Sequence, residues 1–328
     1  SNDILFFSYV LQKATIDNNI FPRFDKLKKE LNLNNYSEIV NYLENTSTDR
    51  LQNKYAIDDA ELFIYNNYTP SSDDCNRMYF KPETGKRIDL IRILLNKWFE
   101  NENITEDEYY YLLAILIETV PYHSNIAGVY GAYLKTWDKR TEKPFKLKKL
   151  KIINNKNNNK SYNLNAHDLI KKIHGDILYL DPPYNIRQYP PNYHVLETIA
   201  KYDYPKIKGV SGMRDYKNQI SLFCRKKDVY NALDDIIKNA NFQYIIMSYS
   251  TDGLLTIDEI EEIFKKHGKS ETYKLDKPIA YRQFKSHKKQ SKKDLHELLF
   301  FVEKNVKNPR SNDKNRFKTK KNIQSTLL

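Results

Sequence analysis

Three short apolar runs in the second half of the chain restrict its fold more than any other feature. They lie at residues 176–180, 242–247 and 298–302. The first ends in Asp-Pro-Pro and the second in Ser-Tyr-Ser, and amphipathic patterns of helical period occupy residues 228–239 and 256–267. Apolar runs of this length between turn-forming residues are typical of buried strands, and strands that alternate with helices form layered sheets. The pattern therefore predicts an α/β fold.

The first half carries long amphipathic patterns in place of short apolar runs. The clearest are residues 89–98 and 106–120. Another helical pattern runs from Asp3 to Ala14, behind an Asn-Asp pair that can cap a helix. We therefore expect residues 21–149 to form a mostly helical module, inserted into a catalytic domain built from residues 1–20 and 150–304.

Basic residues collect at two further places. Lysines at 143, 146, 148, 149 and 151 precede an Asn- and Lys-rich run that ends at Lys160, which we expect to be an exposed loop. Residues 305–328 are predicted to be a disordered basic tail.

Composition narrows the functional class only partly. Lys and Arg outnumber Asp and Glu by 54 to 42, a formal net charge of +12. This charge suits a polyanionic partner, although an AT-rich genome and a solvated surface would give the same Lys and Asn richness. Cys75 and Cys224 form no CxxC or CxxH spacing, so neither a disulfide framework nor a metal site is expected. The most apolar stretch, residues 109–120, is too short for a bilayer span, and we expect a cytoplasmic protein without membrane contact.

The Asp181-Pro182-Pro183-Tyr184 loop sits where α/β sheets bind ligands, at the carboxyl end of a strand. Asp181 offers a carboxylate acceptor, and Tyr184 offers a ring on which a base can stack. The two prolines fix φ and lack N–H donors, so the Pro182 carbonyl can face an amino group. Such a loop can hold a planar amino group and localise its lone pair, or it can simply be a Pro-rich turn that closes a strand.

Leu180 to Tyr189 (LDPPYNIRQY), followed by Asn192-Tyr193-His194, resembles the catalytic loop of the Dam-like adenine-N6 DNA methyltransferases. The most similar branch is that of the FokI-type restriction-modification systems. The resemblance implies a Rossmann-like methyltransferase sheet with a helical target-recognition insert, S-adenosylmethionine as cofactor, and double-stranded DNA as partner. It also implies transfer of a methyl group to a flipped adenine, with host protection as the usual role. Asp181, Pro182, Pro183 and Tyr184 would be the catalytic residues.

Other segments extend the resemblance along the chain. Asn2-Asp3-Ile4 is similar to the family's acidic segment that holds the cofactor ribose, and residues 165–168 resemble the segment whose acid meets the cofactor adenine. The resemblance therefore implies Asp3, Ile4, Asp168 and Asp181 as cofactor-binding residues. Asp3 is equally a candidate helix cap, and Asp168 is equally a candidate surface acid.

Two more segments match the family. Residues 244–253 (YIIMSYSTDG) are similar to the strand and loop that line the target-base pocket. Residues 125–135 (NIAGVYGAYLK) resemble part of the family's module between the cofactor and catalytic motifs, and their role stays open between packing and ligand contact.

A flipped base needs polar and aromatic neighbours, and the phosphates of the DNA backbone need positively charged partners. The DNA contacts that we expect are Asn185, Arg187, Gln188, Tyr189, Tyr249, Tyr281, Arg282, Lys285 and Lys288. Arg187, Gln188 and Tyr189 could instead support the catalytic loop, and residues 281–293 could form a solvated basic loop. By resemblance, Tyr281 would face Tyr184 across the base.

One family signature is missing. No glycine-rich turn of the Phe-x-Gly-x-Gly type precedes Asp3, and the eight glycines of the chain are scattered. We therefore expect the methyltransferase sheet to be incomplete at its N-terminus. A second chain that supplies the motif is the leading hypothesis, and the alternative is that the segment carrying the motif has been cut away.

Two rival functions remain at this point. A DPPY loop can serve any planar amino group, so methylation of cytosine N4 or of an RNA base is one rival. The other is a non-catalytic DNA-recognition subunit, in which the missing turn marks a lost activity.

Overall fold

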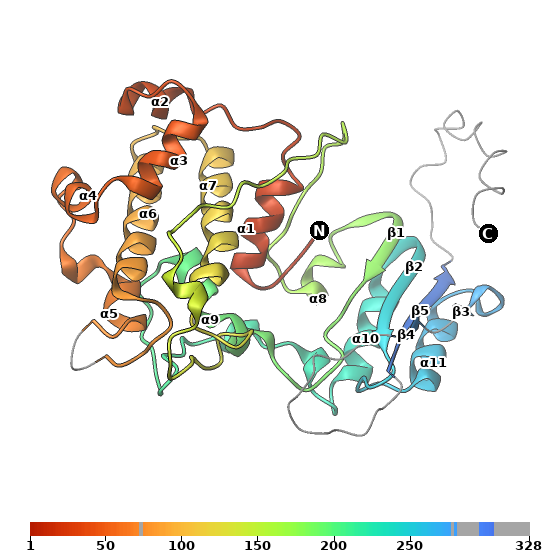
Figure 1. The fold of residues 1–328 in the computed structure, drawn as a ribbon. Helices are drawn as coiled ribbons and strands as arrows, with labels where there is room; N and C mark the ends of the chain where they lie inside the picture. The colour runs from red at the N-terminus through yellow and green to blue at the C-terminus, as the bar shows by residue number, and fades with distance from the viewer. Residues whose placement is uncertain (72–74, 277–278, 281–294, 305–328) are drawn as a thin grey trace. The chain divides into compact units, whose positions relative to one another are not determined.

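The computed structural model describes residues 1–71, 75–276, 279–280 and 295–304, and it has a mixed α/β fold. The chain divides into two compact units that are interleaved in sequence (Figure 1). Unit 1 comprises Ser1–Asp168 and Arg187–Ser221, and unit 2 comprises Leu169–Ile186 and the chain from Leu222 onward. These divisions differ from the boundaries at residues 20 and 149 that the sequence indicated. The predicted basic tail lies outside the described residues.

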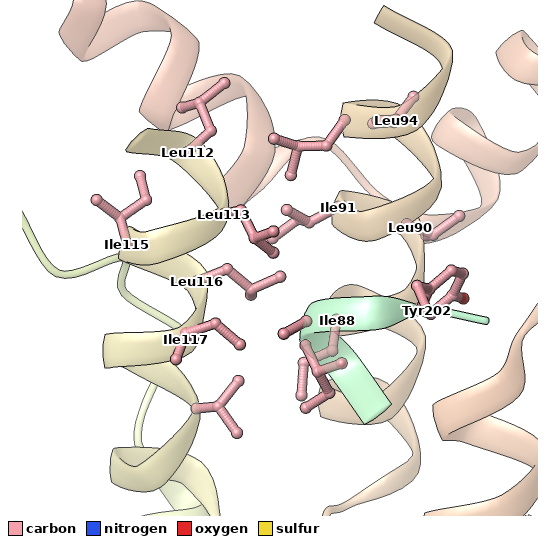
Figure 2. Packing of buried hydrophobic residues seen from close by; sticks show 14 of the residues in the cluster. Ile88, Leu90, Ile91, Leu94, Leu112, Leu113, Ile115, Leu116, Ile117 and Tyr202 are labelled. Atoms are coloured by element: carbon pink, nitrogen blue, oxygen red, sulfur yellow. The ribbon is translucent and has the colours of Figure 1, made fainter. Parts of the chain in front are cut away.

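Unit 1 is built from helices. They are α1 (Phe6–Thr15), α2 (Asp25–Leu31), α3 (Tyr36–Asn45), α4 (Thr48–Tyr55), α5 (Phe63–Tyr68), α6 (Pro82–Glu100), α7 (Glu106–Thr119), the one-turn α8 (Ala166–Leu169), which ends one residue past the unit boundary, and α9 (Tyr189–Lys201). The two longest helices carry the core, and Figure 2 shows their apolar side chains meeting between α6 and α7. Burial of such side chains contributes roughly 1.5–3 kcal/mol each. α1 and α9, which lie outside the predicted module, bury Val10 and Ile199 in the same core.

Local signals explain where the long helices begin. Pro82 occupies the first turn of α6, where its missing N–H costs nothing. Thr105 caps α7, and its own backbone N–H donates to Glu108, which completes a reciprocal capping box. Among the described residues, no helix is long and apolar enough to span a bilayer.

Buried charged side chains tie distant helix ends together in unit 1. Glu197 of α9 accepts hydrogen bonds from the first two backbone N–H groups of α1, at 3.1 and 3.0 Å. Asp89 of α6 accepts from two N–H groups at the start of α5, at 2.8 and 2.7 Å, and from the Tyr202 hydroxyl at 2.6 Å. Arg92 donates from Nε to a carbonyl near the end of α9, at 2.7 Å. Each contact satisfies helix-end groups that have no partner within their own helix.

Unit 2 contains a mixed sheet and two longer helices. The strands are β1 (His174–Leu180), β2 (Asn241–Ser250), β3 (Lys274–Leu275), β4 (Ile279–Ala280) and β5 (His296–Glu303), and the helices are α10 (Val229–Asn239) and α11 (Ile257–His267). The strand order is β1-β2-β5-β3, and β4 also pairs with β5. β1 runs parallel to β2, whereas β5 runs antiparallel to β2, β3 and β4.

The two faces of this sheet differ. On one face, Ile245 and Met247 of β2 and Phe300 and Val302 of β5 are fully buried in a core shared with α10 and α11. On the other face, Ile177 and Tyr179 of β1 are 58% and 59% exposed. The prediction that residues 176–180 form a strand is confirmed, but the prediction that this strand is buried is wrong. Among the described residues, β1 pairs only with β2 and forms the edge of the sheet.

Candidate active site

The Asp181-Pro182-Pro183-Tyr184 loop leaves the carboxyl end of β1 beside the parallel strand β2. Leu180, the last residue of β1, lies opposite Met247. The Tyr184 carbonyl accepts a hydrogen bond from the Leu254 N–H at 2.8 Å. The loop is therefore fastened to the segment that follows β2.

The Tyr184 ring packs edge-on against the ring of Tyr249, with centroids 6.2 Å apart and planes inclined by 76°. Tyr249 is 1% exposed, and its hydroxyl accepts from the Leu255 N–H at 3.2 Å. A Cβ at Gly253 would lie 2.1 Å from Cε1 of Tyr249, so only glycine lets the backbone approach this ring. The Tyr249 ring therefore lies in the core beside Tyr184, and the suggestion from the sequence that Tyr249 contacts DNA stays a prediction.

Asp181 is exposed, and two features of its surroundings act on the pKa of its carboxyl group. Loss of solvent, and then the negative charge of Glu297 on β5, raise the pKa of Asp181 above its ordinary value. Glu297 itself accepts a hydrogen bond from the Ser248 hydroxyl of β2. A carboxylate with a raised pKa is a stronger hydrogen-bond acceptor once it is ionised, which is the property needed to hold an amino group.

The residues after the catalytic motif have several environments. The Gln188 side chain makes two hydrogen bonds with the backbone of Ser221, donating at 2.9 Å and accepting at 2.8 Å. Its amide is thus engaged in bracing the start of α9. Tyr189 begins α9 and is exposed, as is Arg187, whereas Asn185 is half-buried.

The first residues of unit 1 lie beside the segment that precedes α8. Asn2 forms a parallel bridge with Tyr162, and the Asp3 N–H donates to the Tyr162 carbonyl at 3.2 Å. This pairing brings Asp3 and Ile4 toward the chain that continues to Asp168. Asp168 itself is exposed.

Asp3 lies ahead of α1, whose N-cap is Leu5. Its two carboxylate oxygens accept from the Leu5 N–H at 2.8 Å and from the Ser8 hydroxyl at 2.6 Å. Burial raises the pKa of Asp3, against the effect of these hydrogen bonds, and Glu197 raises it further. Each oxygen keeps a second lone pair, so Asp3 can still accept from a ligand hydroxyl.

Sequence reasoning missed two residues that shape this end of unit 1. Glu197 caps α1, and Gln219 donates to the Ile4 carbonyl at 3.2 Å and to Glu197 at 2.6 Å. No local pattern marks either residue, because the backbone groups that they bind near α1 are about 200 positions away in sequence. The predicted contacts Tyr281, Arg282, Lys285 and Lys288 lie outside the described residues.

The sequence model of the D12 class N6 adenine-specific DNA methyltransferases matches residues 1–263. The chain belongs to this family. Membership of the D12 class agrees with the resemblance carried by residues 180–189, and it accounts for the loop at the carboxyl end of β1.

Three curated relatives of this D12-class chain are informative. The type II methyltransferase M.FokI of Planomicrobium okeanokoites is 50% identical over 93% of the chain, and the modification methylase StsI of Streptococcus sanguinis is 37% identical over 93%. These matches cover 45% and 44% of those proteins, so the chain spans a little under half of their length. The type II methyltransferase M.NlaIII of Neisseria lactamica is 39% identical over 78% of the chain and 77% of its own length. No solved structure matches the chain significantly.

Proposed function

We propose that this chain is the catalytic part of a site-specific DNA adenine-N6 methyltransferase. Its substrate would be a flipped adenine in double-stranded DNA, its methyl donor S-adenosylmethionine, and its role the modification step of a restriction-modification system. The observation that carries the proposal is the Asp181–Tyr184 loop, held at the carboxyl end of β1 by the bond from Leu254 to Tyr184. Family membership supports the same activity.

Each residue of the loop has a separate role in activating the adenine amino group. Asp181 accepts one N–H of the adenine amino group and the Pro182 carbonyl accepts the other, which localises the nitrogen lone pair. Pro183 keeps the loop rigid, and Tyr184 stacks on the base. S-adenosylmethionine, when bound, supplies an electrophilic sulfonium methyl group. As the amine nitrogen forms its bond to the methyl carbon, the bond between that carbon and the donor's sulfur would break and leave a neutral thioether. The nitrogen would release one proton to solvent, and the protein forms no covalent bond to the substrate.

Asp3, Ile4 and Asp168 are the residues proposed to hold the cofactor, together with Asp181. The free lone pairs of Asp3 fit the ribose hydroxyls, and the exposed carboxylate of Asp168 fits the adenine amino group. The pairing of Asn2 with Tyr162 supports this assignment, because it joins the two acidic segments within unit 1.

DNA contacts follow from the same proposal. Arg187 and Tyr189 are exposed, and Asn185 adjoins the catalytic motif. Gln188 would act through the start of α9, which it braces, and Tyr249 through Tyr184. Tyr281, Arg282, Lys285 and Lys288 keep their proposed roles as base-stacking and phosphate contacts. The helices of unit 1 would include the target-recognition module, and the protein would work in the prokaryotic cytoplasm, on DNA.

We also propose that a glycine-rich cofactor turn from outside these 328 residues completes the Rossmann-like sheet. The scattered glycines of the chain support this. So does the sheet of unit 2, whose edge strand β1 exposes Ile177 and Tyr179. Parallel α/β sheets are normally covered on both faces, so a further layer would bury these side chains.

Methyl transfer from labelled S-adenosylmethionine to adenine-containing duplex DNA tests the proposal. The chain is assayed alone and co-expressed with the adjoining upstream reading frame, and the product is identified as N6-methyladenine or N4-methylcytosine. Asp181→Ala should abolish transfer while DNA binding persists, and the exposed Asp258→Asn in α11 is the matched control.

Each outcome has a distinct meaning. Adenine label only with the upstream product supports a cofactor turn supplied from outside these residues, and label by the chain alone refutes it. Cytosine label refutes adenine specificity. DNA binding without label in either case would support a recognition subunit and would refute the proposed activity.

A further inference from the structure

An extended stretch of unit 1, here called the lysine segment (residues 143–151), lies across the helices with its cations outward. Phe145, Leu147 and Leu150 are partly buried against the unit 1 core. The exposed residues between them include Lys143, Lys146, Lys148, Lys149 and Lys151. The apolar side chains therefore fix which side of the segment faces solvent.

Hydrogen bonds to two helices hold the backbone of the lysine segment. The Leu147 N–H donates to Glu44 of α3 at 2.7 Å, and the Lys148 N–H donates to the Thr119 hydroxyl of α7 at 2.8 Å. The Tyr111 hydroxyl, also on α7, donates to the Leu150 carbonyl at 3.1 Å. Since the backbone is anchored on rigid elements, a ligand that binds the lysines does not have to order a loop first.

The charge of the lysine segment is largely uncompensated. Lys146 pairs with Glu44 at 3.2 Å. Among the described residues, no carboxylate lies within ion-pair distance of Lys148, Lys149 or Lys151. Burial first, and then the positive charges of Lys148 and Lys143, lower the pKa of the buried His123.

Aromatic rings lie beneath two of these cations. The Lys148 ammonium is 3.8 Å from the ring centroid of Tyr122, which is 53% exposed, and the Lys149 ammonium is 5.9 Å from that of Phe21. A cation over a ring face is attracted by the electrons of the ring and keeps its charge. The ring contacts thus restrict the side chains of both lysines, and their ammonium groups can still bind an anion.

We propose that the lysine segment is a DNA-backbone contact surface on unit 1, separate from the base-reading residues of the catalytic loop. This inference rests on the proposed function, because duplex DNA is the polyanion that the family acts on. Lysines two residues apart in extended chain are separated by about 6.6 Å. The phosphates of one DNA strand recur about every 3.4 Å along the helix axis, and neighbouring phosphates lie farther apart than this in space because the backbone also winds around the axis, so Lys149 and Lys151 can meet neighbouring phosphates.

Salt dependence of DNA binding provides the test. Binding of the whole chain to a fluorescein-labelled duplex is followed by anisotropy between roughly 50 and 200 mM salt, a range in which phosphate contacts dominate affinity. The test variant is Lys148→Gln/Lys149→Gln/Lys151→Gln. The charge-matched control is Arg50→Gln/Lys54→Gln/Lys238→Gln, which removes three exposed cations from α4 and α10.

Each phosphate contact contributes about 0.9 to the slope of log K against log salt, so the test variant should lower the slope by about 3. At about 0.1 M salt the Kd should rise on the order of 100-fold, equally for all duplex sequences. The control should keep the wild-type slope, and Lys→Arg at the same three positions should restore it.

A test variant that keeps its fold, as judged by circular dichroism, and changes the slope no more than the control overturns the proposal. The lysines would then be solvent-exposed charges that do not bind DNA. Binding is measured without cofactor, so failure of methyl transfer both by the wild-type chain alone and with the upstream product would refute the proposed activity while the slopes still decide about the lysine segment.

Discussion

Replacing Asp89 with asparagine should remove a pH dependence from the stability of unit 1. Burial raises the pKa of Asp89 to about 7, against the effect of its bonds from Tyr202, Tyr65 and Ile64. An unfolded chain restores an ordinary pKa near 3.9. The folded state therefore binds this proton more tightly, so the stabilisation is fully present below about pH 4 and is lost as pH rises through 7.

The shift of about 3 pKa units corresponds to about 4 kcal/mol over the whole range, of which about 2.5 kcal/mol falls between pH 5 and 8. An asparagine side chain cannot ionise, so the stability of wild type minus that of Asp89→Asn should fall by this amount from pH 5 to pH 8. The loss of one acceptor oxygen adds only a constant offset.

Urea unfolding followed by tryptophan fluorescence measures this difference. Trp98 and Trp137 are the only tryptophans of the chain, and both belong to unit 1. Asp49→Asn, at an exposed position in α4, is the matched control. If wild type and Asp89→Asn differ in their free energy of unfolding by the same amount at pH 5 and pH 8, the reasoning is refuted. The three hydrogen-bond donors would then lower the pKa of Asp89 by at least as much as burial raises it.

Two further changes probe the catalytic loop. Gly253→Ala forces a Cβ against the Tyr249 ring and should cost about 1–3 kcal/mol in thermal or urea unfolding and lower methyl transfer, whereas Gly131→Ala, with no neighbour nearer than 3.9 Å, should do neither. Glu297→Gln removes the negative charge that raises the pKa of Asp181, so the acid limb of the pH–rate profile should move to lower pH. An unmoved acid limb would mean that Asp181 does not set it.

Regular elements with strong local patterns could be predicted from the sequence. The pattern at residues 106–120 corresponds to α7 and the one at 256–267 to α11, because both helices begin at a threonine capping box. The apolar runs correspond to β1, β2 and β5. α9 was missed because Tyr189-Pro190-Pro191 suggests a loop, although prolines are tolerated in a first helical turn.

Features that depend on distant partners could not be predicted. The exposure of β1 depends on what covers each face of the sheet, which an apolar run does not record. The placement of Asp181 follows from its motif, but the charge that raises its pKa comes from Glu297, more than a hundred residues later. Tyr249 carries the same sequence signal whether its ring faces a base or, as observed, the core.

The interleaving of the two units has a consequence for synthesis. The ribosome completes β1 roughly 60 residues before it begins β2, which at ordinary elongation rates is a delay of about 3–12 s. During that time the nascent chain can finish unit 1, while an apolar strand between residues 169 and 186 waits for its partner. An unpaired strand of this kind invites association with other chains. In a recombinant fragment of unit 1, the stretch that carries the catalytic loop would be a strand without a pairing partner. Such a fragment therefore needs residues 169–186 replaced by a short linker.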